Sequence, residues 1–240
     1  MKNKFEIIYE DERLLAINKP AGMLSIPNRD QSEKSLKERL QEQFGNIFTV
    51  HRLDKDTSGI LLFAKNESSH KYYSQLFEER QIEKYYAGIV IGQPQNPKGS
   101  IIAPIAEHPT QKGLMTVHRN GKPSHTDYEV LQSSKFYSLL KFHLHTGRTH
   151  QIRVHCKNIG HPLACDALYG DGKFVLLSSF KKNYKLSKNE LEEKPVISRL
   201  ALHSFQLVFV DEAGVRRDLI APAPKEFTAL MNQLSKLSAT

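Results

Sequence analysis

The sequence of 240 residues predicts an α+β protein with a mixed, mainly antiparallel central sheet and flanking helices. Three observations lead to this prediction. Runs with strand-like apolar patterning outnumber stretches with helical periodicity, the runs follow one another in neighbouring pairs, and turn residues separate them. Apolar residues make up 39% of the chain, so it can bury a core without disulfides or a structural metal.

The first elements are a hairpin and a helix. Phe5–Met23 contains two short apolar runs joined by charged residues, which is typical of a β-hairpin. Gln31–Phe44 is predicted to be helical, because Leu36 and Leu40 are four residues apart, as are Leu40 and Phe44, with charged residues between them.

The next stretch alternates strands and a helix. Ile60–Ala64 and Tyr85–Gly92 are apolar enough for strands, and Ser68–Arg80 places its large apolar side chains on one helical face. Gln93–Gly121 is rich in Pro, Gly and Asn, so we expect loops there.

The second half begins with two strands and a short helix. Ser124–Val130 and Tyr137–His145 are predicted strands, the second with an alternating apolar and basic pattern. Thr149 is the expected N-cap of a helix whose apolar stripe includes Ile152 and Cys156.

The chain is predicted to end in a strand and a closing helix, at Leu200–Val210 and Pro224–Leu237. Ser178–Pro195 is polar and charged, and we expect a mobile loop. No repeats occur, and the length fits one large domain or two small ones; we expect a single domain over residues 1–240.

The charge of the chain favours an anionic partner. Lys and Arg together number 34 against 26 Asp and Glu, giving +8 and a pI near 9.3. The window Val130–Cys165 contains no Asp or Glu, although average composition predicts about four. We interpret this window as a basic surface; chance clustering on a solvated face is the alternative.

Several classes of protein are excluded by composition. Mean hydropathy is −0.47 and no apolar run approaches the ~20 residues of a membrane span. Only Cys156 and Cys165 are present, which excludes a disulfide framework and fits a reducing compartment. We see no signal peptide and expect a cytoplasmic location.

The densest early polar cluster is His51-Arg52-Leu53-Asp54-Lys55-Asp56-Thr57-Ser58-Gly59. The cation at Arg52 favours the ionised form of Asp54, and an ionised carboxylate on a turn suits a nucleophile or a general base. A turn capped by Asp side chains is the structural alternative, and the residues alone leave both open.

A second cluster runs from Thr146 to His155. If a helix begins at Thr149, Arg153 and His150 share a polar face, and the helix N-terminus favours an anion. A zinc site is conceivable from four histidines, but their spacing fits no standard pattern and we expect no metal. The four are His143, His145, His150 and His155.

These clusters resemble the signature motifs of the RluA-type pseudouridine synthases. The matching segments are residues 51–59, 147–155, 160–163 and 166–170, with Lys84-Tyr85-Tyr86 and Arg199-Leu200-Ala201-Leu202-His203 in the expected order. The resemblance runs from about Phe5 to Phe227. Many relatives carry a small basic domain of the S4 type before the core, and we expect none here because the core-like hairpin begins at Phe5.

The resemblance implies a central RNA-binding cleft and the cofactor-free isomerisation of a uridine in rRNA or tRNA. It implies that Asp54 is the catalytic aspartate, that Tyr86 packs on the target base, and that Arg153 pairs with Asp54. Asp54 could attack C1′, attack the base or abstract a ribose proton. The residues expected to bind RNA are Arg52, which replaces the flipped uridine in the stack, Leu202 in the base pocket, and His51, Lys84, Arg148, His150 and Gln151.

Structured RNA is therefore the expected partner, with no membrane, no required protein partner and a monomeric state. Two other functions remain as alternatives. A non-catalytic RNA-binding relative would lack Asp54 or Tyr86, and both are present. A metal hydrolase using Asp54 and Asp56 would need further ligands close to them.

Overall fold

The computed structural model describes residues 5–28, 31–181, 184–186 and 191–238, which divide into two compact units. The first unit extends to Tyr86 and includes His143–His145 and His203–Pro222. The second contains Ala87–Phe142, Thr146–Leu202 and the residues from Ala223 onward. Strands β5, β10 and β11 each contribute residues to both units.

The first unit is built on strand β4 (Ser58–Ala64), all seven residues of which are buried. β4 pairs antiparallel with β2 and β3 and parallel with β11, so the sheet is mixed, as expected. The elements of this unit are β1 (Glu6–Glu10), β2 (Leu14–Lys19), α1 (Leu36–Phe44), β3 (Phe48–Thr49), β4, α2 (Glu67–Glu78), the start of β5 (Glu83–Ile91), most of β11 (Leu202–Val210) and β12 (Arg216–Ile220).

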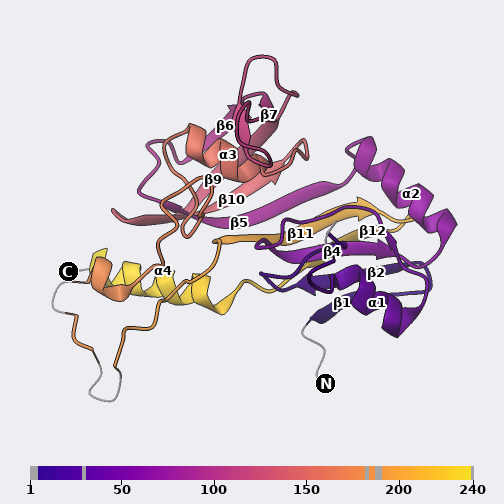
Figure 1. Cartoon of the computed structure of the whole chain (residues 1–240), viewed down its shortest axis with the longest axis horizontal. Coiled ribbons are helices and arrows are strands. Elements are labelled where there is room, and N and C mark those ends of the chain that lie inside the picture. The colour runs from indigo at the N-terminus through magenta and orange to yellow at the C-terminus, as the bar shows by residue number, and fades with distance from the viewer. Residues whose placement is uncertain (1–4, 29–30, 182–183, 187–190, 239–240) are drawn as a thin grey trace. The chain divides into compact units, whose positions relative to one another are not determined.

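Side-chain caps determine where the two helices of this unit begin. α1 starts five residues later than expected because Ser35 and Glu38 form a reciprocal capping box. In α2, the Asn66 side chain accepts a hydrogen bond from the backbone N–H of Ser69 at 2.9 Å. α2 contacts β3 and β4, and its residues Tyr73 and Leu76 enter the core. In Figure 1, β2 lies between β1 and β4 in the sheet of this unit.

The second unit contains antiparallel strands in the order β5–β10–β9–β6 and a separate hairpin of β7 and β8. Its elements are the end of β5, β6 (Lys98–Ile102), β7 (Ile105–Glu107), β8 (Met115–Val117), β9 (His125–Ser133), most of β10 (Tyr137–Leu144), α3 (Gln151–Asn158), the 3₁₀ helix η1 (Leu177–Ser179) and α4 (Lys225–Ser238).

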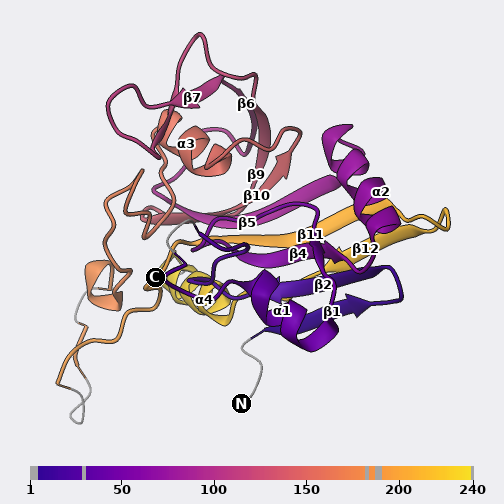
Figure 2. The ribbon, with the colours of Figure 1, turned by 45° about the vertical axis from the view of Figure 1, so that its right-hand side comes forward.

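Two helices cover different parts of the second unit. α4 contributes Phe227 and Leu230 to a core with Ile89 and Ala201. α3 lies against β8 and β9 (Figure 2), where Val154 packs with residues of the β7–β8 hairpin. Among the helices of the described ranges, none is both long and apolar enough to span a bilayer.

The expectation of loops over Gln93–Gly121 is wrong, because β6, β7 and β8 all lie in this segment. These strands are three to five residues long, too short for a periodic pattern to show among the turn residues. Their regularity comes from pairing: β6 pairs with β9, and β7 with β8. The sequence also gave no sign of β12, which pairs with β11.

The N-cap expected at Thr149 is also wrong, because α3 begins at Gln151 and His150 is its N-cap with φ 55°. The Gln151 side chain fixes the preceding turn by accepting a hydrogen bond from the backbone N–H of Arg148 at 3.0 Å. The first six residues of α3 are all buried, so the helix has no exposed polar face there. In the expected loop Ser178–Pro195, residues 182–183 and 187–190 lie outside the described ranges.

Candidate functional site

Asp54 lies in the loop between β3 and β4. Its side chain is partly exposed, the preceding Leu53 is buried, and Arg52 is exposed. The backbone N–H of Thr57 donates to the carbonyl of Asp54 at 3.2 Å, which closes a turn. This turn presents the carboxylate at the surface of the first unit, next to a buried strand.

Ser25 binds the peptide groups immediately before Asp54. Its buried hydroxyl donates to the carbonyl of Leu53 at 2.7 Å and accepts from the backbone N–H of Leu53 at 3.2 Å. The Ser25 hydroxyl thus satisfies both the N–H and the carbonyl of Leu53, the residue before Asp54. These bonds fix the direction in which the chain enters Asp54.

Lys19 and Gly22 bind the residue immediately after Asp54. The Nζ of Lys19 is fully buried and donates to the carbonyls of Pro20 (3.1 Å), Met23 (2.8 Å) and Lys55 (2.9 Å). The backbone N–H of Gly22 also donates to the Lys55 carbonyl, at 2.9 Å. Backbone groups on both sides of the proposed catalytic residue are therefore held by the segment from residue 19 to residue 25.

Gly59 allows strand β11 to approach this loop. A Cβ at this position would lie 2.0 Å from the carbonyl oxygen of Ser204, and φ is +111°, so only glycine fits. The parallel pairing of Ser204 with Gly59 follows from this close approach, and the Ser58 hydroxyl hydrogen-bonds the His203 ring at 2.9 Å.

Tyr86 is buried beside Asp54 and Ser204 within the same unit. Burial raises the pKa of Tyr86 to about 12, the Ser204 hydroxyl opposes this rise, and the negative charge of Asp54 adds to it. Asp54 therefore lies close enough for its charge to act on the phenol. The structure brings these two predicted residues together, and Tyr86 stays a neutral phenol throughout the physiological pH range.

His51 occupies a structural position in the same motif. Its Nε2 accepts the backbone N–H of Leu62 at 2.9 Å, and its ring stacks on Phe77 with centroids 4.3 Å apart. Burial, followed by the positive charge of Lys84, lowers the pKa of His51 to about 3. The neutral imidazole thus supports β4 from inside, and its contact with RNA stays a prediction.

Lys84 is buried as well, at 8% exposure. Burial lowers its pKa, and the nearby charge of Arg80 lowers it further. Its role in RNA binding stays a prediction.

In the second unit, Gln151 organises the turn before α3. Its Oε1 accepts from the hydroxyl of Thr146 at 2.8 Å, and its Nε2 donates to the carbonyl of His125 and the hydroxyl of Thr126. The amide is buried, and both its oxygen and its nitrogen form hydrogen bonds. Gln151 therefore holds the residues of this turn in position. The exposed Nε of Arg148 donates to the carbonyl of Pro123 at 3.2 Å.

Arg153 forms a buried bidentate pair with Asp166. Its Nε donates to Oδ2 and its Nη2 to Oδ1, both at 2.8 Å. Asp166 also accepts the backbone N–H groups of Leu168 and Tyr169, while the Tyr169 ring lies 5.0 Å from the guanidinium. This pair fixes the orientation of Arg153, and its pairing with Asp54 stays a prediction.

Tyr169 links this ion pair to two other segments. Its hydroxyl hydrogen-bonds Nδ1 of His150 at 2.7 Å and accepts the backbone N–H of Met115 at 2.9 Å. Sequence reasoning missed the roles of Asp166 and Tyr169, although the motif at residues 166–170 contained both. It also missed Ser25 and Lys19, for which the only signal was the turn sequence Lys19-Pro20-Ala21-Gly22.

The acid-free window Val130–Cys165 is only partly a basic surface. Arg153 and His155 are buried, and His155 hydrogen-bonds the Thr126 hydroxyl at 2.9 Å. Lys135 and Lys157 are exposed. Some basic residues of this window therefore form internal hydrogen bonds, and others contribute positive charge to the surface.

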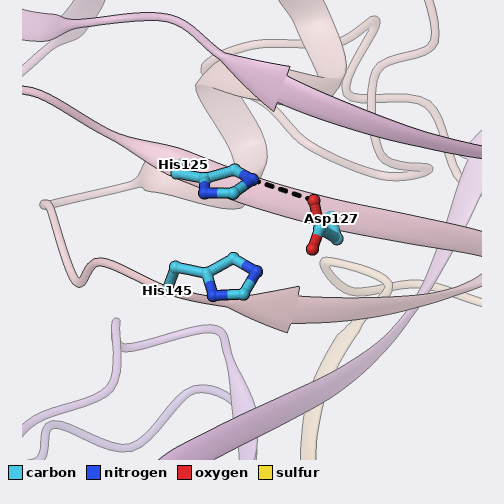
Figure 3. Close-up of side chains that lie close together, drawn as sticks. All are labelled: His125, Asp127 and His145. Atoms are coloured by element: carbon cyan, nitrogen blue, oxygen red, sulfur yellow. Dashed lines mark hydrogen bonds and ion pairs between the residues drawn. The ribbon is translucent and has the colours of Figure 1, made fainter.

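One group of metal-binding side chains occurs among the described residues. The ligand atoms of His125, Asp127 and His145 lie within 4.8 Å of one another (Figure 3). His125 and Asp127 both belong to β9 and are joined by a 2.9 Å contact from Nε2 to Oδ1. Two imidazoles and a carboxylate could ligate a divalent ion, but Asp54 and Asp56 do not belong to this group.

The predicted site residues fall into two sets. The first unit contains His51, Arg52, Asp54, Lys84 and Tyr86, and the second contains Arg148, His150, Gln151, Arg153 and Leu202. Leu202 is buried at the start of β11.

Comparison with known proteins identifies one family. The model of the RNA pseudouridylate synthase family matches residues 13–158. A ribosomal large subunit pseudouridine synthase D from Buchnera aphidicola is 40% identical over 189 residues, covering 76% of this chain and 60% of the relative. A dual-specificity RNA pseudouridine synthase RluA from Vibrio vulnificus is 38% identical. The match covers 70% of this chain and 70% of the relative.

A solved structure supports the fold. Human RNA pseudouridylate synthase domain containing 1 superposes with a TM-score of 0.72 at 27% identity, covering 92% of this chain and 84% of the human chain. Measured against three of the most similar curated relatives, the chain spans 55 to 64% of their length.

Proposed function

Because the chain belongs to the RluA-type family of RNA pseudouridine synthases, we propose that it isomerises a uridine in structured RNA, ribosomal or transfer, to pseudouridine. In this reaction the N1–C1′ bond breaks, the base rotates, and a C5–C1′ bond forms. C5 loses a proton and N1 gains one, so substrate and product are isomers. No oxidant, reductant or second substrate is required, and we expect no cofactor.

The observation that carries the proposal is the position of Asp54 beside Tyr86. The carboxylate is partly exposed on a turn whose flanking backbone is held by Ser25 and Lys19. Burial is the main cause of the raised pKa of Tyr86, and the charge of Asp54 adds to it. A fixed carboxylate next to an aromatic wall is what a reaction on a single extruded nucleotide requires.

The target base must leave its stack before Asp54 can reach it, which costs a few kcal/mol. Stacking on the ring of Tyr86 offsets this cost, since such contacts contribute ~1–3 kcal/mol per base. Arg52 is exposed on the same loop, where it can enter the position that the uridine leaves. We assign Leu202 to the apolar part of the base pocket.

Arg153 is proposed to orient Asp54 in the RNA-bound enzyme. A guanidinium carries five N–H donors on two edges, and Asp166 binds the edge formed by Nε and Nη2. Arg148, His150 and Gln151 are proposed to shape the RNA surface around it.

We further propose that both units serve one catalytic domain, that the enzyme works as a monomer without a required protein partner, and that it acts in the cytoplasm. A non-catalytic RNA-binding role is less well supported because Asp54 and Tyr86 are both present and the charge of Asp54 acts on Tyr86.

The test is to map pseudouridines in total RNA from cells with and without the gene. Purified protein should then restore the missing site in RNA from the deletion strain, with and without excess chelator. We expect one or a few uridines to depend on the gene and chelator to have no effect. Complete maps that are identical in both strains, with no activity of the purified protein, would overturn the proposal.

A further inference from the structure

A cavity of about 460 Å³ opens beside the loop that carries Asp54. Its size lies within the range of about 300–1,000 Å³ that is typical of sites for small organic groups. The residues that line it are Pro20, Ala21, Gly22, Met23, Glu33, Lys34 and Arg39. All belong to the first unit.

The turn that lines the cavity also binds the loop that carries Asp54. The lining segment from Pro20 to Met23 is the turn whose backbone binds Lys55 through the N–H of Gly22. Glu33, also part of the lining, forms an ion pair with the side chain of Lys55. An occupant of the cavity would therefore lie close to Asp54 along the bound RNA.

Arg39, on α1, also lines the cavity. Its Nε is buried away from the cavity, and no described residue accepts a hydrogen bond from it. A guanidinium fork matches the oxygens of a phosphate, so the side chains of Arg39 and Lys34 at one cavity favour an anionic occupant.

The remaining lining residues indicate which other chemical groups the occupant carries. Lys34 pairs with Glu42 in an exposed ion pair, and such pairs contribute about 0–1 kcal/mol, so Lys34 can turn to a stronger anion. The carboxylate of Glu33 is already engaged by Lys55. Pro20 and Met23 add apolar surface against which a ribose or base can pack.

We propose that this cavity binds one nucleotide of the substrate RNA that lies near the target uridine. Its phosphate contacts Arg39 and Lys34, and its sugar or base packs against Pro20 and Met23. The proposal rests on the proposed function, since it requires an RNA substrate, and it adds a second nucleotide site to that of the target base.

The test compares Arg39→Gln with Lys71→Gln, a matched loss of charge at an exposed position of α2. Arg39→Gln should weaken RNA binding about tenfold, as expected for loss of a charged hydrogen bond. The slope of log K against log salt should fall by about 0.7. The dissociation constant should change by a larger factor than the single-turnover rate at saturating RNA. Lys34→Gln provides a second variant if Arg39→Gln folds poorly.

Substrates with one neutral methylphosphonate at a time then locate the occupant. At one position, a methylphosphonate should weaken RNA binding by the wild type and by Lys71→Gln. The same methylphosphonate should not weaken RNA binding by Arg39→Gln or Lys34→Gln. If no position shows this coupling, or if all three variants bind alike, the cavity does not hold a nucleotide. A wild type that binds RNA but forms no pseudouridine would instead refute the proposed function and leave this test intact.

Discussion

Ser25 is expected to determine how precisely the carboxylate of Asp54 is placed. Ser25→Ala removes both hydrogen bonds to Leu53 and leaves a buried donor and acceptor unsatisfied, which costs about 1–3 kcal/mol. Because Leu53 precedes Asp54, we predict a lower single-turnover rate at saturating RNA, by about tenfold or more. Affinity for RNA should change little, since Ser25 is buried.

The control for this prediction is Ser68→Ala, which removes an exposed hydroxyl at the start of α2. Rates and thermal unfolding are measured for both variants. If Ser25→Ala lowers only the unfolding temperature and leaves the rate unchanged, then Ser25 stabilises the fold without positioning the catalytic loop.

His51 is expected to make the free energy of unfolding depend on pH. Its pKa is about 3 in the folded protein and about 6.5 when unfolded, so the unfolded state binds more protons between these values. Stability should therefore fall as pH drops below 6.5, by up to about 1.4 kcal/mol per pH unit from this one group.

Denaturant unfolding of the wild type and His51→Gln between pH 4 and 8 measures this contribution. The wild type should show the steeper loss of stability toward low pH. Equal slopes, or an imidazole whose NMR signals titrate near pH 6.5 in the folded protein, would show that His51 is not held neutral.

The sequence predicts roles for Asp54 and Tyr86 because each of them lies in a compact motif. It did not identify Ser25 or Asp166, because each acts through a hydrogen bond to a residue at least 13 positions away. Such pairs depend on the tertiary fold, and no local pattern marks them. The hydrogen bond from Leu62 to His51 and the stacking of its ring on Phe77 are likewise tertiary contacts that the motif does not reveal.

Helix α3 and the segment that follows it form a single supporting unit for Arg153. Arg153→Lys cannot keep the bidentate geometry with Asp166, because an ammonium is a point charge without a planar fork. We predict that this variant mainly loses turnover, together with part of its stability. Arg148→Lys should mainly lose RNA affinity, since Arg148 is the more exposed and contacts a backbone carbonyl.

Single-turnover rates and dissociation constants for the two variants distinguish these effects. A third variant, Asp166→Asn, tests the same ion pair from its acidic side. Removing one partner of a buried ion pair costs about 3–5 kcal/mol of stability. If Arg148→Lys loses turnover while Arg153→Lys loses only affinity, the two roles are reversed.

Strand β4 of the first unit was predictable from sequence, whereas β12 and the strands between Gln93 and Gly121 were not. β4 is buried along its whole length and gives an unbroken apolar run. β6 to β8 are short, and β6 alternates buried and exposed residues over only part of its length. β6 pairs with β9, and β7 pairs with β8. These tertiary contacts, and not local propensity, make the three segments strands.

Across the whole chain, the net charge of +8 should make RNA binding depend strongly on salt. Each phosphate neutralised on a single strand lowers log K by roughly 0.7 per decade of salt concentration. Lys141→Glu should weaken binding to all RNAs alike, because phosphate contacts position RNA without reading its sequence. Fluorescence anisotropy over a salt series measures both effects, and a flat response would refute a surface that follows phosphates.

The account depends most on Asp54, and Asp54→Asn tests it most directly. The amide keeps the size of the side chain and removes the negative charge. The measurement is the single-turnover yield of pseudouridine in RNA at saturating enzyme, together with the dissociation constant for the same RNA. We predict unchanged folding, near-normal RNA binding and no detectable pseudouridine. Pseudouridine formation at the wild-type rate would contradict the assignment of Asp54 as the catalytic residue.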